Sequence, residues 1–162
     1  MSTRVTILVD GPSGAGKTTF ATQLARDTGI QIVHLDDFYP GWSGLDEGVR
    51  MVVEDVLHPT RPGYTRWDWE NDRSAEWVDI DPDADLIVEG VGALTQASYE
   101  AASALGDVIA IRITAPYAER KHRALERDPG YAEYWDMWAE QERALRMREF
   151  PVTADLVLRG SA

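Results

Sequence analysis

The sequence predicts an α/β fold built on a largely parallel β-sheet. Three observations favour it: five short apolar runs have strand character, helical patterns lie between them, and a glycine-rich segment follows the first run. Most of the runs are continuous rather than alternating, as is typical of parallel strands buried on both faces. They cover Val5–Val9, Ile30–Leu35, Leu86–Val88, Val108–Ile113 and Leu156–Leu158. Such sheets bind ligands beyond the carboxyl ends of their strands, so the residues after each run are the candidates for function.

Helical patterns occupy the intervals between these runs. After the first run, Phe20 and Leu24 stand at helical spacing, and Gly29 is a good C-terminal cap. Further helices are predicted over 45–57, 95–105, 114–127 and 131–148. Asp128-Pro129-Gly130 separates the last two, and Pro151 is expected to stop the final helix.

Composition and charge restrict the classes of protein that the chain can represent. Its 162 residues suit a single domain over 1–162 with a core of its own. The absence of cysteine excludes disulfides and thiolate metal sites, and it fits a reducing, cytoplasmic setting. The formal net charge of −12 repels nucleic acids and anionic membranes, and no stretch approaches the ~20 apolar residues of a membrane span. We therefore expect neither nucleic acid nor membrane as a partner.

Residues 11–18 read Gly-Pro-Ser-Gly-Ala-Gly-Lys-Thr, a complete G-x-x-x-x-G-K-[ST] pattern. The pattern lies between a strand-like run and a helical one, which is the context that a phosphate-binding loop requires. Its glycines let successive N–H groups face one anion, and the helix N-terminus adds partial positive charge. Lys17 is expected to reach the β- and γ-phosphates, and the Thr18 hydroxyl to ligate Mg²⁺. The predicted nucleotide contacts are Gly11, Ser13, Gly14, Ala15, Gly16, Lys17, Thr18 and Thr19.

Acidic residues follow two further strand-like runs. Asp36 and Asp37 follow the second run, where a carboxylate can orient an attacking hydroxyl and accept its proton. Glu89 directly follows the third run. It is the candidate for a second Mg²⁺ ligand besides Thr18, because Mg²⁺ prefers oxygen ligands. A solvated turn and a strand cap are the alternatives. With a phosphate loop on the neighbouring strand, we favour the functional interpretation of both sites.

Arg120, Arg123 and Arg127 recur at spacings of three and four, so they share one face of a predicted helix. Such a face is usually only solvated. Phosphoryl transfer, however, needs cations that neutralise the charge developing on the transferred group. We predict that at least one of the three arginines has this role.

Aromatic residues form two groups. The first could stack on a base or sugar or form a small core under a long loop, and both interpretations stay open; it comprises Tyr39, Trp42, Tyr64, Trp67, Trp69 and Trp77. The second lies at helical spacing and favours packing; it comprises Tyr131, Tyr134, Trp135 and Trp138. The three histidines, His34, His58 and His122, lack metal-ligand spacing and are predicted to be structural or exposed.

Taken in order, these motifs resemble the uridine kinase and phosphoribulokinase-like branch of P-loop kinases. The resemblance rests on the loop at 11–18, on Leu35-Asp36-Asp37-Phe38-Tyr39, on Arg66-Trp67-Asp68-Trp69, and on Val88-Glu89-Gly90. The run of arginines from Arg120 is similar to the lid of that family. The resemblance implies a three-layer fold with helices on both faces of a five-stranded sheet of order 2-3-1-4-5. It also implies ATP and Mg²⁺ as cofactors and a lid at about 120–135.

By the same resemblance, Asp36 is the counterpart of the catalytic base, and the acceptor-binding segment spans about 37–80. Acceptor contacts are then expected from Asp36, Asp37, Tyr39, Arg66 and Asp68. The implied activity is transfer of the ATP γ-phosphate to a hydroxyl of a small molecule. This segment is compressed and rich in tryptophan compared with uridine kinases, so the resemblance does not extend to uridine as the acceptor.

Two alternatives stay open. A nucleoside monophosphate kinase needs arginines in its acceptor pocket, and Arg50, Arg61, Arg66 and Arg73 lie in the right segment, although acidic residues outnumber them there. A switch or weak ATPase that acts through a partner protein is the second alternative. The sequence lacks both the Asn-Lys-x-Asp motif of GTPases and the Leu-Ser-Gly-Gly-Gln signature of transporter ATPases, which argues against those two subclasses.

Overall fold

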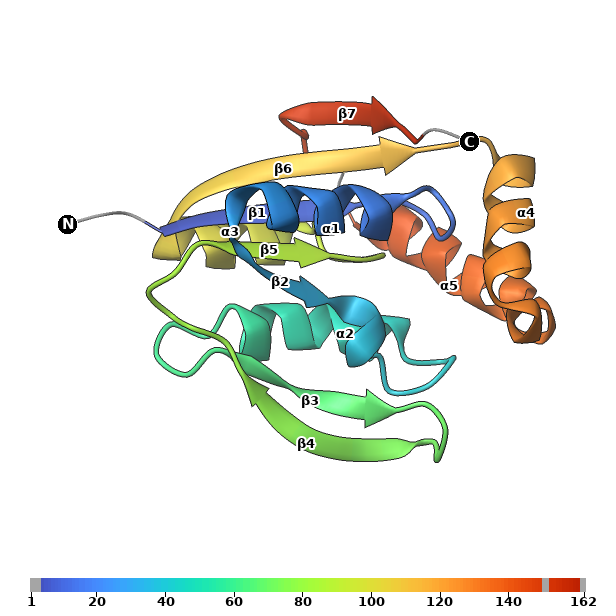
Figure 1. Ribbon diagram of the computed structural model, residues 1–162, viewed down its shortest axis with the longest axis horizontal. Coiled ribbons are helices and arrows are strands. Elements are labelled where there is room, and N and C mark those ends of the chain that lie inside the picture. Colours follow the sequence, from blue (N-terminus) through green and yellow to red (C-terminus); the bar gives the residue numbers. More distant parts are fainter. Residues whose placement is uncertain (1–3, 150–151, 161–162) are drawn as a thin grey trace.

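A five-stranded parallel sheet forms the centre of the molecule (Figure 1). The computed structural model describes residues 4–149 and 152–160. The sheet comprises β1 (Arg4–Asp10), β2 (Gln31–His34), β5 (Leu86–Glu89), β6 (Gly106–Thr114) and β7 (Leu156–Arg159). The strands pair in the order β2-β5-β1-β6-β7, and every pair is parallel. The prediction of a parallel α/β fold from five apolar runs is confirmed.

The strand order follows from counting these five strands along the chain, which gives 2-3-1-4-5. The labels in Figure 1 differ from this count because two further strands, β3 and β4, come between β2 and β5 in the sequence. β1 lies in the middle of the sheet, with β5 on one side and β6 on the other. The loop after β1 therefore opens where the strand order reverses, which is the place where such sheets bind ligands.

Helices cover both faces of the sheet, because neighbouring residues of a strand point to opposite sides. Ile7 and Val9 pack with α1 on one face, whereas Leu8 belongs to the core cluster that includes residues of α2, α3 and α5 on the other. The helices are α1 (Lys17–Thr28), α2 (Leu45–Met51), α3 (Gln96–Leu105), α4 (Tyr117–Arg127) and α5 (Trp135–Arg148). No helix in the described ranges is long and apolar enough to cross a membrane.

Local sequence explains where α1 ends and where α3 begins. Gly29 caps α1 in the left-handed conformation (φ 74°), and Thr95 opens α3 with a capping box that it shares with Ser98. The helix predicted over 45–57 continues from α2 into a π-helical turn, Val52–Val56. The predicted starts at 114 and 131 were early: Thr114 still belongs to β6, and a 3₁₀ helix, Pro129–Glu133, precedes α5. Pro151 lies outside the described residues.

An antiparallel hairpin that the sequence analysis did not predict joins β3 (Gly63–Asp68) to β4 (Arg73–Asp79). Neither strand has an apolar run in its sequence. This agrees with the structure, in which most residues of β4 are exposed. Tyr64 packs on Phe38 with ring centroids 5.2 Å apart, and Arg66 pairs with Glu76 across the hairpin at 2.6 Å. The strand pairing, the Arg66–Glu76 ion pair and the contact of Tyr64 with Phe38 therefore stabilise the hairpin. None of these contacts is visible as a local sequence pattern.

Candidate active site

The phosphate-binding loop connects β1 to α1 and is in the open, curled conformation that its glycines allow. Gly14 and Gly16 have φ values of 80° and 102°, which side-chain-bearing residues rarely adopt. A Cβ atom at Gly14 would lie 2.3 Å from the carbonyl oxygen of Arg120, so the first turns of α4 touch the loop directly. Lys17 is almost fully buried, and its Nζ donates to the carbonyl oxygen of Pro12 at 3.0 Å. The lysine is thus held against the phosphate-binding loop, where it is expected to contact the phosphates.

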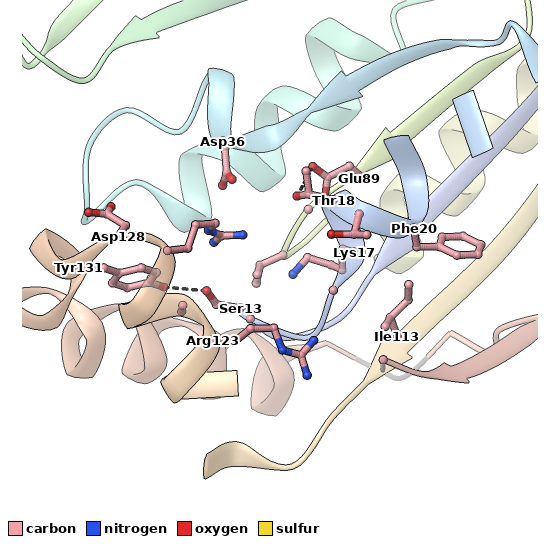
Figure 2. Close-up of a pocket in the computed structure, with 18 of the residues that line it drawn as sticks. Ser13, Lys17, Thr18, Phe20, Asp36, Glu89, Ile113, Arg123, Asp128 and Tyr131 are labelled. Carbon is pink, nitrogen blue, oxygen red and sulfur yellow. Dashed lines mark hydrogen bonds between the residues drawn. The ribbon is translucent and has the colours of Figure 1, made fainter. Parts of the chain in front are cut away.

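A cavity of about 1170 Å³ opens above this loop, at the carboxyl ends of the central strands (Figure 2). Lys17, Thr18, Asp36 and Glu89 line it together, although they come from three separate segments of the chain. One end of the cavity is apolar and lies beside Phe20 and Ile113. The other end is lined mainly by aromatic rings and carboxylates, which include Asp36, Trp42, Trp69, Asp128, Tyr131 and Trp138.

Thr18 and Glu89 meet at the base of the cavity. The Thr18 hydroxyl donates to Oε1 of Glu89 at 2.9 Å, and Glu89 is 2% exposed. A hydroxyl and a carboxylate are the hard oxygen ligands that suit Mg²⁺. No group of three or more His, Asp or Glu residues able to hold a metal occurs among the described residues. The pair therefore fits Mg²⁺ only as a partial site, in which phosphate oxygens and water would complete the coordination.

His34 belongs to the same corner, which the sequence analysis missed. β2 pairs with β5 so that His34 lies opposite Glu89, and its Nδ1 approaches Oε1 of Glu89 at 2.6 Å. The hydrogen bond that His34 makes to this carboxylate raises the pKa of His34, against an opposing effect of burial. The signal for this contact is the strand register, which is not readable from spacing along one strand.

Asp10, the last residue of β1, also escaped sequence analysis. Its buried carboxylate accepts N–H groups from Gly11 at 2.6 Å, Gly92 at 3.2 Å and Leu94 at 2.8 Å. Burial raises the pKa of Asp10, while these hydrogen bonds lower it. The three bonds connect the start of the phosphate loop to the turn that follows Glu89. Asp10 thereby fixes the position of the loop relative to that turn.

Asp36 reaches the cavity from a short 3₁₀ helix, Leu35–Asp37, at the end of β2. Its side chain points into the cavity (Figure 2). Asp36 is exposed to solvent within the cavity. Partial desolvation by the cavity walls, together with Glu89, raises the pKa of Asp36, whereas Lys17 and Arg127 lower it. Asp36 therefore stands within the electrostatic influence of the predicted metal, phosphate and lid residues.

Of the other residues predicted to contact the acceptor, one lines the cavity and three do not. Tyr39 lines the cavity from the core, and its hydroxyl donates to the carbonyl oxygen of Val91 at 2.6 Å. Asp37, Arg66 and Asp68 do not line the cavity. The Asp68 carboxylate caps the turn of the hairpin by accepting N–H groups of Glu70 and Asn71. Of the predicted nucleotide contacts, only Gly11 and Ala15 are absent from the cavity wall.

The three arginines of the predicted lid differ in whether they line the cavity. Arg123 and Arg127 line the cavity, and Nη2 of Arg123 is buried without a hydrogen-bond partner in the part of the chain that the structure describes. Arg120 does not line the cavity; its Nη1 donates to the carbonyl oxygen of Ser13 at 3.1 Å. An unpartnered buried guanidinium nitrogen beside a phosphate loop is a ready donor for an anion. Of the three arginines of the predicted lid, Arg123 and Arg127 therefore line the cavity, and Arg120 does not.

Ser13 is held at all three of its polar groups by residues far along the chain. Its N–H donates to the buried carboxylate of Glu142 at 3.0 Å, and its carbonyl oxygen accepts from Arg120. The Tyr131 hydroxyl donates to Oγ of Ser13 at 2.9 Å, which Figure 2 marks with a dashed line. We call this set of contacts the Ser13 clamp. It fastens the phosphate loop to α4, α5 and the turn between them.

The second aromatic group packs, as predicted, but it packs against the first. Trp42 stacks on Tyr134 with ring centroids 4.7 Å apart and planes 6° from parallel, and it lies 4.8 Å from Tyr131. The same tryptophan lies 5.2 Å from Trp69, near the tip of the hairpin. Residues of both groups therefore form one continuous aromatic wall, with Trp69, Trp42, Tyr131 and Tyr134 in contact, between the predicted acceptor segment and the predicted lid.

Comparisons with known proteins bear on the fold. No protein-family model matches the sequence, and no curated protein matches it. A solved structure of a possible uridine kinase from Bacillus stearothermophilus is 20% identical with a TM-score of 0.57, over 98% of this chain and 90% of that one. A putative fructose transport system kinase from Silicibacter sp. TM1040 is 21% identical with a TM-score of 0.60, over 97% and 90%. The chain therefore shares its fold with these two solved structures.

Proposed function

We propose that the protein is a kinase that transfers the γ-phosphate of ATP to a hydroxyl group of a small molecule, with Mg²⁺ as its cofactor. One observation carries the proposal: Lys17, the Thr18–Glu89 pair and Asp36 converge on one cavity, and Arg123 and Arg127 of α4 line it as well. These are the parts that phosphoryl transfer needs, namely a phosphate cradle, a place for the metal, a carboxylate for the nucleophile, and cations for the transferred group.

The donor half of the cavity fits a nucleoside triphosphate. The phosphates would lie along the loop, where Lys17 would exchange its hydrogen bond to Pro12 for phosphate oxygens. Thr18 and Glu89 would hold Mg²⁺, and the bound ion would neutralise charge between the phosphates. The apolar end beside Phe20 and Ile113 remains for the nucleobase.

The acceptor half supplies the base. Asp36 would accept a hydrogen bond from the acceptor hydroxyl, orient its oxygen toward the γ-phosphorus, and take up the proton as the new P–O bond forms. Arg123 and Arg127 would stabilise the negative charge on the transferred group. The lid and the aromatic wall would keep water from competing with the acceptor.

The geometry favours this proposal over a nucleoside monophosphate kinase. That activity requires cations for the phosphate of the acceptor, yet none of the candidate arginines lines the cavity. Arg50 is ion-paired with Glu47 and Glu54, and Arg66 is ion-paired with Glu76. A kinase for a non-phosphorylated hydroxyl acceptor is therefore the better match.

A coupled ADP-release assay with Mg-ATP tests the proposal. The panel comprises nucleosides, nucleoside monophosphates, pantothenate, sugars and sugar acids. We expect one class of acceptor to stimulate ADP release well above the acceptor-free rate. ATP binding with no stimulation by any acceptor would favour the switch or ATPase instead.

The pH profile is expected to report Asp36. As a base it must be ionised, so kcat/KM should fall as the pH falls through its pKa. Because partial desolvation and Glu89 raise that pKa, the decline should begin at a higher pH than for an ordinary aspartate of pKa ~3.9. Arg127 lowers the pKa of Asp36, so Arg127→Met should move the acid limb of the profile to a still higher pH. Arg123→Met, whose charge is not among the main influences on Asp36, should move it less; equal shifts would contradict the assignment.

The Ser13 clamp gives a smaller, separable effect. Tyr131→Phe removes the hydroxyl that donates to Ser13 but keeps the ring in the aromatic wall. The loss of one hydrogen bond of about 1 kcal/mol should loosen the loop and raise the KM for ATP by up to roughly fivefold, with a fall in melting temperature of only about 2–4 °C. Tyr134→Phe is the control, because the Tyr134 hydroxyl makes no hydrogen bond within the described ranges. Equal KM values for the two variants would show that the clamp does not position the loop.

A further inference from the structure

Aromatic side chains and carboxylates line the half of the cavity beyond Asp36. Trp42, Trp69, Tyr131 and Trp138 all line it, and the first three lie within ring-contact distance along the wall. Trp138 is almost fully buried, whereas Trp69 is 39% exposed. Trp69 is thus the ring of this wall with the most surface left for a ligand.

Trp69 is fixed directly to the proposed base. It follows β3 near the tip of the hairpin, and its indole Nε1–H donates to the main-chain carbonyl oxygen of Asp36 at 2.7 Å. This bond holds the edge of the ring, and the Asp36 side chain points into the same cavity. A molecule that lies on the face of Trp69 therefore has its hydroxyl groups within the neighbourhood of the Asp36 carboxylate.

Charged groups at this end do not favour an anion. Asp36 and Asp128 line it, and Arg127 is the cation that acts on Asp36 from the lid. Lys17 also acts on Asp36, but the proposed function assigns both Lys17 and Arg127 to the phosphates of the donor. The other cations of the cavity wall lie elsewhere: Arg123 is beside the phosphate loop at Gly16, and Arg159 ends β7. A bound triphosphate would add further negative charge next to this end. An acceptor with a phosphate or carboxylate group would meet more repulsion than attraction.

We infer that the acceptor is an uncharged ring compound that stacks on Trp69, beside Trp42, and presents a hydroxyl group to Asp36. The inference rests on the proposed kinase function and goes beyond it by naming the chemical class of the acceptor and a specificity-determining residue. Trp69 provides the contact that the resemblance assigned to Asp68, whose carboxylate is occupied in the hairpin turn. Ring stacking selects for a flat or apolar face without reading its substituents. Nucleosides and cyclic sugars share this chemistry.

Binding without turnover tests the class of acceptor. Isothermal titration of the wild-type protein compares uridine with UMP and glucose with glucose 6-phosphate, in the absence of ATP. We expect the neutral member of at least one pair to bind, and to bind more tightly than its phosphorylated counterpart. Tighter binding of the phosphorylated members would overturn the inference, and so would the absence of binding by both neutral rings at millimolar concentration.

Substitutions then test Trp69 itself. Trp69→Ala should weaken binding of the neutral ring by roughly fivefold or more, the loss of one stacking contact. Trp69→Phe keeps a ring face but loses the bond to Asp36, so it should retain most of the binding. Trp77→Ala is the control for a loosened hairpin, because Trp77 is 41% exposed on β4 and does not line the cavity. Equal losses in Trp69→Ala and Trp77→Ala would contradict the stacking contact.

The two proposals can fail separately. If an acceptor is phosphorylated but its KM is unchanged in Trp69→Ala, the kinase function stands and the stacking inference falls. If neutral rings bind through Trp69 but no phosphate is transferred, the inference about the ligand stands and the kinase function falls.

Discussion

Replacing Asp36 by asparagine is expected to lower kcat by roughly 10²- to 10⁴-fold, the contribution of general base catalysis, with little change in the affinity for ATP. Asparagine keeps the size of the side chain and can still accept a hydrogen bond from the acceptor hydroxyl. It cannot take up the proton as that hydroxyl attacks. The loss should therefore appear in the transfer step and not in donor binding.

Single-turnover kinetics and ATP titration on the same variant separate these quantities. Asp37→Asn is the closest comparison, because Asp37 is the neighbouring carboxylate but does not line the cavity. We expect Asp37→Asn to lose far less activity. Wild-type turnover in Asp36→Asn, or equal losses in the two variants, would remove Asp36 from the role of base.

Lys17→Ala is expected to lower kcat by about 10²- to 10³-fold, as for other donors aimed at charge that develops in the transition state. The ammonium group is buried at the phosphate loop and held by Pro12, so its position is already set before the donor binds. Unlike the Asp36 variant, this one should also bind ATP more weakly, because the lysine contacts the phosphates of the ground state too.

The sequence supplies a matched control for this prediction. Lys121 is the only other lysine of the chain, and it lies on α4 outside the cavity. Lys121→Ala changes the net charge by the same amount and should leave kcat and ATP affinity nearly unchanged. ATP titration and initial rates with both variants make the comparison. An active Lys17→Ala protein would contradict the use of the phosphate loop in catalysis.

The parallel sheet and the arrangement of the central site could be predicted because their signals are local. The loop motif stands between a strand and a helix, and Asp36 and Glu89 directly follow apolar runs. Parallel strands bring such positions to one edge of the sheet, so adjacency in space follows from topology. The Thr18–Glu89 hydrogen bond, between residues 71 positions apart, is an example.

The rest of the site could not be predicted because it depends on tertiary contacts. His34 was interpreted as structural or exposed, since its contact with Glu89 follows from strand register and not from spacing. The hairpin has no apolar run, so the turn that occupies Asp68 and brings Trp69 to Asp36 has no signature in the sequence. Glu142 reaches Ser13 across 129 residues, which no local pattern encodes.

The most direct test of the central claim follows the γ-phosphate itself. ATP labelled at the γ-phosphate is incubated with Mg²⁺, the protein and the acceptor panel, and the label is traced to the acceptor, to inorganic phosphate or to unreacted ATP. We predict label on the acceptor with the wild-type protein and almost none with Asp36→Asn, although both bind ATP. Label that appears only as inorganic phosphate, at a rate that no acceptor changes, would contradict the kinase and identify an ATPase.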